Sequence, residues 1–159
     1  MTRQIIAFDK EQIHAGNKGL AIDHDAVTKR VDALLSTMTL AQKINQIRGL
    51  QPETIDGLYY AGEDNDLNIA PFKMVDGPRG ARTGNATAFP VAIARAATFD
   101  VALERRVGMA IGREVAARGG NVLLAPTINL LRHPGWGRAQ ETYSEDTYHT
   151  GAMGVAFVS

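Results

Sequence analysis

The stretch that decides the fold is Val122-Leu123-Leu124-Ala125-Pro126-Thr127-Ile128-Asn129-Leu130-Leu131-Arg132-His133-Pro134-Gly135-Trp136-Gly137-Arg138. Its apolar start, over residues 121–125, is typical of a β-strand that is covered on both faces. A proline then ends the strand, and a loop follows that carries amide, guanidinium, imidazole and indole groups. Proteins that layer helices on parallel strands bind ligands at the carboxyl ends of those strands. We therefore expect this loop to bind a polar ligand.

Two helices are predicted before any strand. Residues 25–38 place an apolar residue at every third or fourth position, which indicates a helix with one apolar stripe. Thr39-Leu40-Ala41-Gln42 then fits a capping box, and the apolar pattern that follows it predicts a second helix of about two turns before Gly49. Residues 1–23 are mixed and polar, and we interpret them as a lead-in arm.

The remaining elements alternate between strands and helices. Residues 51–70 show no period and are interpreted as a long loop. We predict strands over 72–75, 89–97 and 121–125, a helix that Asp100 caps and that runs to about Arg118, and a last helix capped by Ser144. Apolar strands separated by helices predict an α/β fold with a parallel sheet, either a barrel or an open sheet.

Composition excludes several classes of protein. The chain has 159 residues, which is a normal single-domain length but short for a complete eight-unit barrel of about 250 residues. Its 17 basic and 17 acidic side chains are not clustered, so neither nucleic acid nor an anionic membrane is expected as a partner. Cysteine is absent, and the N-terminus has too short an apolar stretch for a signal peptide, so a cytoplasmic location is expected.

Three loop residues are the candidate binding groups. Asp76 follows the predicted strand 72–75, so its loop and the loop over 129–138 should share one face of the sheet. A carboxylate accepts hydrogen bonds from two adjacent hydroxyls, and the planar forks of Arg82 and Arg138 donate to neighbouring oxygens. That combination fits a sugar ring, although Asp76-Gly77-Pro78 is also a common turn sequence.

Other polar motifs have competing interpretations. Trp136 either stacks on a ligand or packs in the core, and Ser144-Glu145-Asp146 is either a helix cap or a pair of catalytic acids. His133 and His149 lack the spacing of helical metal ligands, and Gly-Pro-Arg-Gly matches no nucleotide-binding fingerprint. No metal site and no nucleotide site is predicted.

Four ordered motifs resemble the N-terminal domain of glycoside hydrolase family 3, the β-glucosidase type. They are Lys73-Met74-Val75-Asp76-Gly77-Pro78-Arg79-Gly80, Phe89-Pro90 through Ala96-Ala97-Thr98-Phe99-Asp100, Leu124-Ala125-Pro126-Thr127-Ile128-Asn129-Leu130-Leu131-Arg132, and Gly135-Trp136-Gly137-Arg138-Ala139-Gln140-Glu141-Thr142-Tyr143-Ser144-Glu145-Asp146. The resemblance runs from about residue 25 to the end. It implies that residues 24–159 form two opening helices followed by the N-terminal part of a (β/α)8 barrel of the TIM type. The downstream half of the barrel and the α/β sandwich domain that usually follows it in the family are expected to lie outside these residues.

The resemblance also implies a function. Members of this family are retaining enzymes that release terminal β-linked sugars, with an aspartate nucleophile, an acid/base carboxyl group and no cofactor. Asp76 resembles the carboxylate that holds hydroxyls of the terminal sugar, Arg138 the arginine that reaches the same ring, and Arg82 an arginine that contacts it in some members. Glucose, xylose and N-acetylglucosamine are all substrates within the family, and the sequence does not select among them or set an oligomeric state.

The resemblance further places the family's nucleophile and acid/base beyond Ser159, so the 159 residues are expected to lack activity alone. A partial barrel would also leave open strand edges and an uncovered apolar interior. The alternative is a small complete α/β domain that binds a sugar or an anion without catalysis. A monomer that melts cooperatively would favour this alternative.

Overall fold

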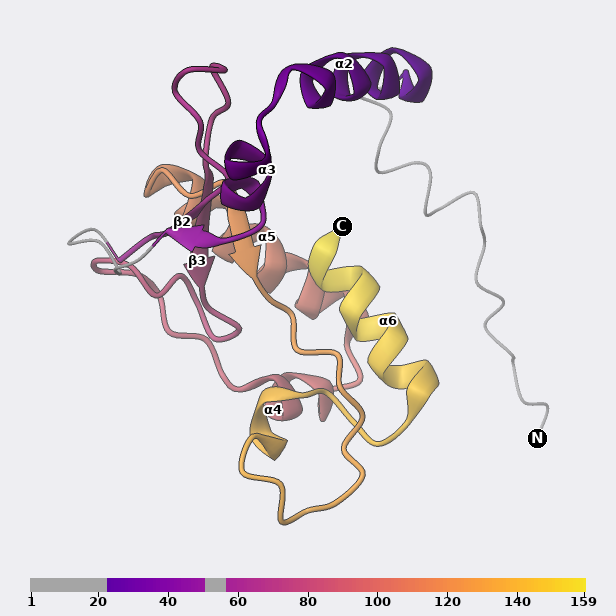
Figure 1. Ribbon diagram of the computed structural model, residues 1–159. Coiled ribbons are helices and arrows are strands. Elements are labelled where there is room, and N and C mark those ends of the chain that lie inside the picture. Colours follow the sequence, from indigo (N-terminus) through magenta and orange to yellow (C-terminus); the bar gives the residue numbers. More distant parts are fainter. Residues whose placement is uncertain (1–22, 51–56) are drawn as a thin grey trace. The chain divides into compact units, whose positions relative to one another are not determined.

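A computed structural model of the chain describes residues 23–50 and 57–159 (Figure 1). The chain divides into two compact units after Thr39, and each unit is described separately below. The predicted arm over residues 1–23 lies outside the described residues except for Asp23. Its domain limits therefore stay a prediction.

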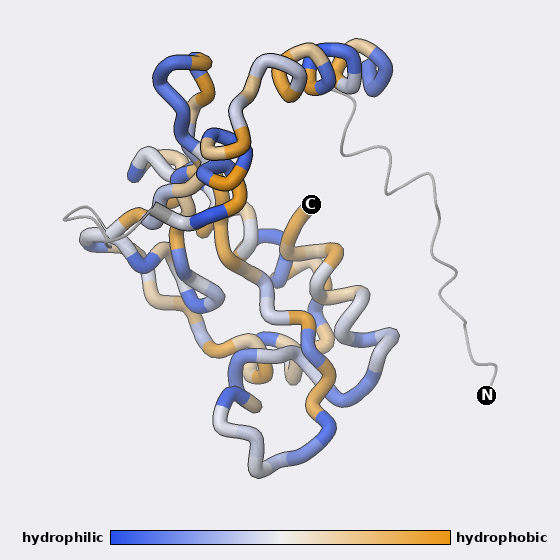
Figure 2. The backbone as a smooth tube through the Cα atoms, viewed as in Figure 1, coloured by the Kyte–Doolittle hydropathy of each residue, from blue (hydrophilic) through white to orange (hydrophobic). Residues whose placement is uncertain are grey.

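The first unit contains helix α2, His24–Thr37, which confirms the first predicted helix. Asp23 caps it, because the carboxylate accepts a hydrogen bond from the backbone N–H of Ala26 at 3.0 Å. The predicted apolar stripe is present on α2, where hydrophobic and hydrophilic residues alternate along the helix (Figure 2). Val27, Val31 and Leu35 on that stripe are exposed.

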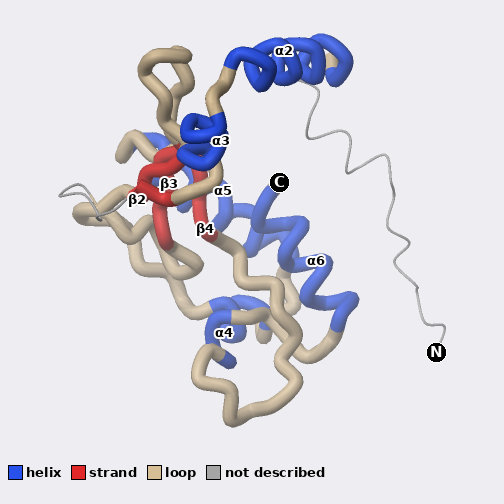
Figure 3. Tube along the Cα trace, viewed as in Figure 1, coloured by secondary structure: helices blue, strands red, loops and turns tan. Residues whose placement is uncertain are grey.

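The second unit is built on a four-stranded sheet in the order β1-β2-β3-β4 (Figure 3). After helix α3, Leu40–Gln46, come β1, Gly49–Leu50, β2, Tyr59–Ala61, β3, Phe72–Asp76, and β4, Val122–Leu124. The pairs β1–β2 and β2–β3 are antiparallel, and only β3–β4 is parallel. The unit is therefore α/β, but the prediction of a parallel sheet is wrong for the first two pairs.

One loop prediction and one strand prediction are corrected by the structure. The predicted loop over residues 51–70 contains β2, whose three residues are too few to show an alternating pattern in the sequence. The predicted strand over 89–97 is instead helix α4, Ala92–Ala96. Alanine has the highest helix propensity, and the small side chains of this segment allow α4 to pack closely rather than to form a strand.

The core lies where helices α5, Val101–Ala117, and α6, Thr147–Val158, pack together beside β3. Asp100 caps α5 as predicted, because its carboxylate accepts a hydrogen bond from the N–H of Leu103 at 2.8 Å. The helices approach closely at Gly108, where an added Cβ would lie 2.2 Å from the carbonyl oxygen of Phe157. The buried apolar side chains of this core are Leu58, Val75, Ala81, Val107, Ile111, Val115 and Phe157.

The cap of α6 differs from the prediction by two residues. Asp146, not Ser144, is the N-cap, and its carboxylate accepts a hydrogen bond from the N–H of His149 at 2.6 Å. The Ser144 hydroxyl accepts from the N–H of Asp146 at 3.0 Å instead. Ser144 thus stabilises the turn that leads into the helix, and Asp146 accepts a hydrogen bond from a free backbone N–H of the first helical turn.

A buried ion pair connects the helices of this unit. The Arg95 guanidinium of α4 donates to both carboxylate oxygens of Glu104 on α5, at 2.8 and 3.1 Å. Arg95 also donates to the carbonyl oxygens of Pro78 and Pro90, and the Tyr143 hydroxyl donates to Glu104 at 2.6 Å. Arg95, Glu104 and Tyr143 are 3 %, 0 % and 1 % exposed, so water does not compete for these bonds.

We expect Glu104→Ala to lower the free energy of unfolding by about 3–5 kcal/mol, because it leaves the Arg95 charge buried without a partner. The double variant Arg95→Met/Glu104→Leu removes both charges and should cost only about 1–3 kcal/mol, mainly the penalty of an unpaired Tyr143 hydroxyl. The Pro78 and Pro90 carbonyl oxygens also lose Arg95 as a donor, but both prolines are partly or fully exposed, so water replaces it. Urea unfolding followed by circular dichroism measures both values. A double variant less stable than Glu104→Ala would contradict this account.

Burial raises the pKa of Tyr143 above its ordinary value of 10.0, and the hydrogen bond to Glu104 raises it further. A raised pKa in the folded state stabilises the protein below pH 10 and loses that contribution as the pH rises further. The free energy of unfolding should therefore fall above pH 10. Tyr143→Phe should remove most of this fall, whereas Tyr148→Phe, at an exposed position, should keep it.

Candidate functional site

The site begins where β3 ends, at Asp76. Its parallel neighbour β4 ends at the same level, since Asp76 lies opposite Leu124 in the ladder. Asn121 sets this register, because its side-chain oxygen accepts from the N–H of Lys73 at 2.7 Å and its backbone N–H donates to the Lys73 carbonyl at 2.9 Å. Asp76 is thus held at the carboxyl edge of the sheet.

The loop after Asp76 is closed by backbone hydrogen bonds and glycines. The N–H of Arg82 donates to the Asp76 carbonyl at 2.8 Å, so the chain returns to its starting point within six residues. An added Cβ on Gly77 would lie 2.0 Å from the carbonyl oxygen of Gly80, and one on Gly80 would lie 2.0 Å from that of Thr87. Only glycine fits at either position.

The end of this loop, at Thr87, is hydrogen-bonded to helix α5. Both the N–H and the hydroxyl of Thr87 donate to the Glu114 carboxylate, at 2.9 and 2.6 Å. The Thr87 hydroxyl and N–H lower the pKa of Glu114 from its ordinary value. Arg118, at the end of the same helix, donates to the Asn85 carbonyl. The loop is therefore held at both its start and its end.

The three predicted site residues lie together in one depression of about 590 Å³. Its volume is within the range of small-ligand sites. The loop after β3 forms one part of its lining, and the segment around η1, Ala139–Glu141, forms the other. The lining residues are Asp76, Gly77, Pro78, Arg79, Gly80, Ala81, Arg82, Ala86, Thr87, Ala88, Arg138, Gln140 and Glu141.

Asp76 and Arg82 form a loose ion pair within the depression. The Arg82 Nη1 lies 3.4 Å from the Asp76 Oδ2, and the two side chains are 68 % and 40 % exposed. Exposed pairs of this kind contribute only about 0–1 kcal/mol to stability. The Asp76 carboxylate therefore remains available to accept hydrogen bonds from a ligand.

Arg138 is held much more tightly by Glu141. Its Nε and Nη2 donate to the two carboxylate oxygens of Glu141, at 2.9 and 2.6 Å. This pairing raises the pKa of Arg138 and lowers that of Glu141, and the charge of Asp76 contributes a smaller part of the Arg138 shift. Two of the five guanidinium N–H groups are used by Glu141. The other three N–H groups can donate to a ligand, and the two bonds to Glu141 already fix the plane of the guanidinium.

Glu141 was not among the residues predicted from the sequence. The available signal was its position three residues after Arg138, a spacing at which opposite charges meet on one turn of a helix. No such local signal identifies the hydrogen bond from Thr87 to Glu114, which lies 27 residues away in the sequence. The same holds for the buried pair Arg95–Glu104, whose members lie 9 residues apart.

Trp136, His133 and His149 do not line this depression, whereas the Gly77-Pro78-Arg79-Gly80 motif does. Trp136 is half-buried and lines a separate hollow of about 370 Å³ with Asn129, Leu130, Arg132 and His133. His149 stacks on Phe99, with ring centroids 4.6 Å apart, and its Nε2 lies 2.9 Å from the Ala96 carbonyl oxygen. Over residues 23–50 and 57–159, no three His, Cys, Asp or Glu side chains are grouped as metal ligands would be. In the same residues no helix has the length and hydropathy of a membrane span.

Comparison with known proteins gives consistent matches. Residues 27–159 match the family model of the glycosyl hydrolase family 3 N terminal domain. A β-glucosidase from Rhizobium radiobacter is 37 % identical over 136 residues, and β-glucosidase B from Emericella nidulans is 33 % identical over 135 residues. Both matches cover 81 % of this chain but only 16 % and 15 % of the relatives, so the chain spans about a sixth of their length.

Solved structures show the same relationship. β-Glucosidase 3B from Thermotoga neapolitana, in complex with glucose, matches with a TM-score of 0.74 and 34 % identity over 80 % of this chain and 20 % of that chain. DesR, a β-glucosidase from Streptomyces venezuelae in complex with D-glucose, matches with a TM-score of 0.73 and 32 % identity over 80 % and 17 %. The family model, the curated relatives and the solved structures all agree: the chain belongs to glycoside hydrolase family 3, within the N-terminal domain of that family.

Proposed function

We propose that this chain supplies the sugar-binding part of a retaining, exo-acting β-glycosidase of the β-glucosidase type. The observation that carries the proposal is the shared depression, in which the Asp76 carboxylate and the oriented Arg138 fork lie together. The β-glucosidase names of its relatives and the glucose bound to two similar structures support a sugar as the ligand.

The proposed binding mode follows from the charges in the depression. Asp76 accepts hydrogen bonds from two adjacent hydroxyls of the terminal sugar, since a carboxylate has two acceptor oxygens. Arg138 donates its remaining N–H groups to a neighbouring hydroxyl while Glu141 keeps it in place. Arg82 is displaced from Asp76 or shares it with the sugar, because their contact is long and exposed. These residues hold the substrate and break no bond.

In a retaining enzyme, a carboxylate attacks the anomeric carbon while an acid protonates the leaving oxygen, and water then hydrolyses the glycosyl-enzyme. We propose that both of these carboxyl groups come from outside residues 1–159. The strands and helices of this chain are then the N-terminal part of a (β/α)8 barrel, with β3 and β4 as parallel barrel strands. The chain alone is expected to bind sugar without turning it over.

Asp76→Asn should weaken the binding of D-glucose by at least about tenfold, because it removes a charge-assisted hydrogen bond worth about 1.5–3 kcal/mol. Arg82→Gln should change the affinity by no more than about threefold, since Arg82 is mostly exposed and loosely paired. Titration of the ¹⁵N-labelled chain with glucose, followed at the amides of Gly77 and Gly80, measures both. Equal affinities of Asp76→Asn and the parent chain would refute the role of Asp76, and hydrolysis of p-nitrophenyl β-glucoside by the pure chain would refute its inactivity.

Gly77→Ala should displace the loop that carries Asp76, because the new Cβ would lie 2.0 Å from the Gly80 carbonyl oxygen. We expect a loss of glucose binding of at least tenfold together with amide shift changes over residues 76–82. Gly137→Ala is the matched control, since its Cβ meets nothing within 4 Å. If both variants bind glucose as the parent does, the loop geometry is not what sets the affinity.

A further inference from the structure

Trp136 is the only tryptophan of the chain, and the structure does not place it in the core. It belongs to neither of the two clusters of buried apolar residues found within residues 23–50 and 57–159. It lies instead, half-buried, at the wall of the hollow of about 370 Å³. Core packing and stacking on a ligand are the two roles that the sequence allows for Trp136. Its placement favours the second.

The turn that carries Trp136 is fixed by its own hydrogen bonds. The Trp136 N–H donates to the His133 carbonyl at 3.1 Å, and the Gly135 N–H donates to Nδ1 of the His133 ring at 3.0 Å. The Ala139 N–H donates to the Trp136 carbonyl at 3.0 Å. Because Nδ1 accepts a hydrogen bond, the neutral His133 ring carries its proton on Nε2 and can donate it to a ligand. This wall of the hollow therefore keeps its shape through bonds within the turn.

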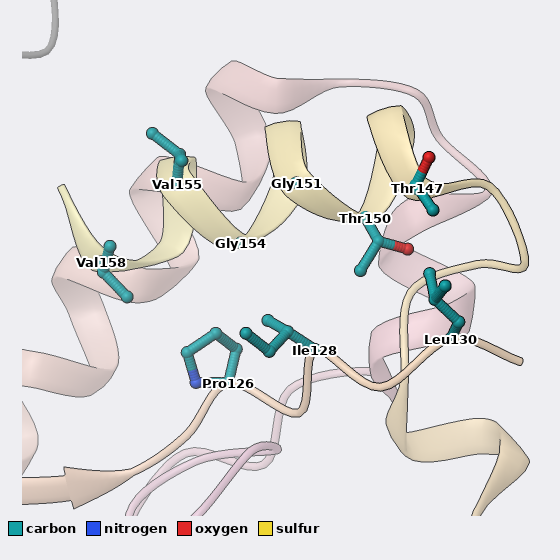
Figure 4. A pocket seen from close by; sticks show the side chains of 9 residues that line it. All are labelled: Pro126, Ile128, Leu130, Thr147, Thr150, Gly151, Gly154, Val155 and Val158. Atoms are coloured by element: carbon teal, nitrogen blue, oxygen red, sulfur yellow. The ribbon is translucent and has the colours of Figure 1, made fainter.

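The segment that follows β4 forms the other wall of the hollow. Its apolar side chains line a groove against helix α6, and they are Pro126, Ile128 and Leu130 (Figure 4). Ile128 packs there on Gly154, since an added Cβ on Gly154 would lie 3.1 Å from Ile128 Cγ2. The polar side chains of Asn129 and Arg132 line the hollow, and Leu130 lines both. The apolar contacts with α6 thus hold in place a segment whose polar groups face a different space.

The hollow has cationic and hydrogen-bond-donating groups but no acidic one. Its lining residues are Asn129, Leu130, Arg132, His133 and Trp136, and none of them lines the depression that contains Asp76. Arg132 is exposed, and its guanidinium forms no ion pair with any residue that the structure describes. An arginine fork matches the two oxygens of a carboxylate. A free cation beside a flat aromatic face fits a ring that carries a carboxylate.

We propose that this hollow is a second carbohydrate site, separate from the depression, and that it takes an acidic sugar, a pyranose ring with a carboxylate such as a uronic acid residue. The C–H face of the ring stacks on the Trp136 indole, which supplies a flat apolar surface. Arg132 donates to the carboxylate, while the Asn129 amide and the His133 ring bond to hydroxyls. The hollow is large enough for one such ring. The site needs neither the residues of the depression nor the proposed hydrolysis.

A single tryptophan makes this hollow directly observable. In the ¹⁵N-labelled chain the one indole N–H signal reports on Trp136, while the amides of Gly77 and Gly80 report on the depression. Titration with D-glucuronate at neutral pH and constant ionic strength should shift the indole signal to saturation. D-glucose lacks the carboxylate, acetate lacks the ring, and benzoate lacks the hydroxyls. Read at the same signal, each of the three should bind at least about fivefold more weakly than D-glucuronate.

Arg132→Gln tests the recognition of charge. It should weaken the binding of D-glucuronate at the indole signal by at least about fivefold, because it removes a charge-assisted hydrogen bond to the carboxylate. Arg113→Gln is the matched control, since it removes the same charge from an exposed position on α5, and it should bind like the parent chain.

Trp136→Leu tests the stacking surface. It should weaken the binding of D-glucuronate by at least about tenfold, because it removes the flat face on which the ring lies. The amide of Gly137 replaces the indole as the reporter in this variant. Phe72→Leu, which removes an aromatic ring that is 59 % exposed on β3, is the matched control and should bind like the parent chain. The circular dichroism spectrum of each variant, compared with that of the parent chain, shows whether it is folded.

Several outcomes would overturn the proposal. D-glucuronate that shifts the amides of Gly77 and Gly80 but not the indole of Trp136 would place the acidic sugar in the depression. Equal binding of D-glucose at the indole would refute the recognition of charge, and equal binding of acetate or benzoate would refute a sugar site. Binding by Arg132→Gln or Trp136→Leu at the affinity of the parent chain would also overturn it. A saturating shift at Trp136 in a chain whose glycine amides do not respond to D-glucose would instead refute the proposed function and support this second site.

Discussion

The buried contact between Arg95 and Glu104 is the constraint on which the rest of the second unit depends. Two full charges with almost no exposure are stable only if each finds its partners in good geometry. Glu104 also accepts from Tyr143, and Arg95 also donates to the Pro78 carbonyl. This network therefore forms only when four segments are folded at the same time: helix α4, helix α5, the loop after β3 and the segment before α6.

The same contact links the fold to the sugar site. Pro78 comes two residues after Asp76, and Tyr143 comes two residues after Glu141, the partner of Arg138. The buried pair thus anchors both segments that line the depression, while the residues that face a ligand stay exposed. Rigidity and binding are supplied by different side chains, which lets the exposed charges change partners without unfolding the protein.

Local pattern was enough to predict the long helices and to place three of the residues that line the depression on one face of the sheet. The N-cap residue Asp100 and the regularly spaced apolar residues that follow it predict α5 correctly. The apolar run over 121–125 predicts β4. The three residues Asp76, Arg82 and Arg138 could be placed on one face because they follow the ends of two neighbouring strands. Their role in binding sugar rests on the family and remains a proposal.

What the sequence did not predict depends on contacts between distant segments. The segment over 89–97 mixes alanines, which favour a helix, with Val91 and Ile93, which favour a strand, so its local pattern is ambiguous and packing decides. Strand β2 has three residues and is defined by its pairing with β3. Arg95 and Glu104 look like ordinary surface charges until the fold buries them.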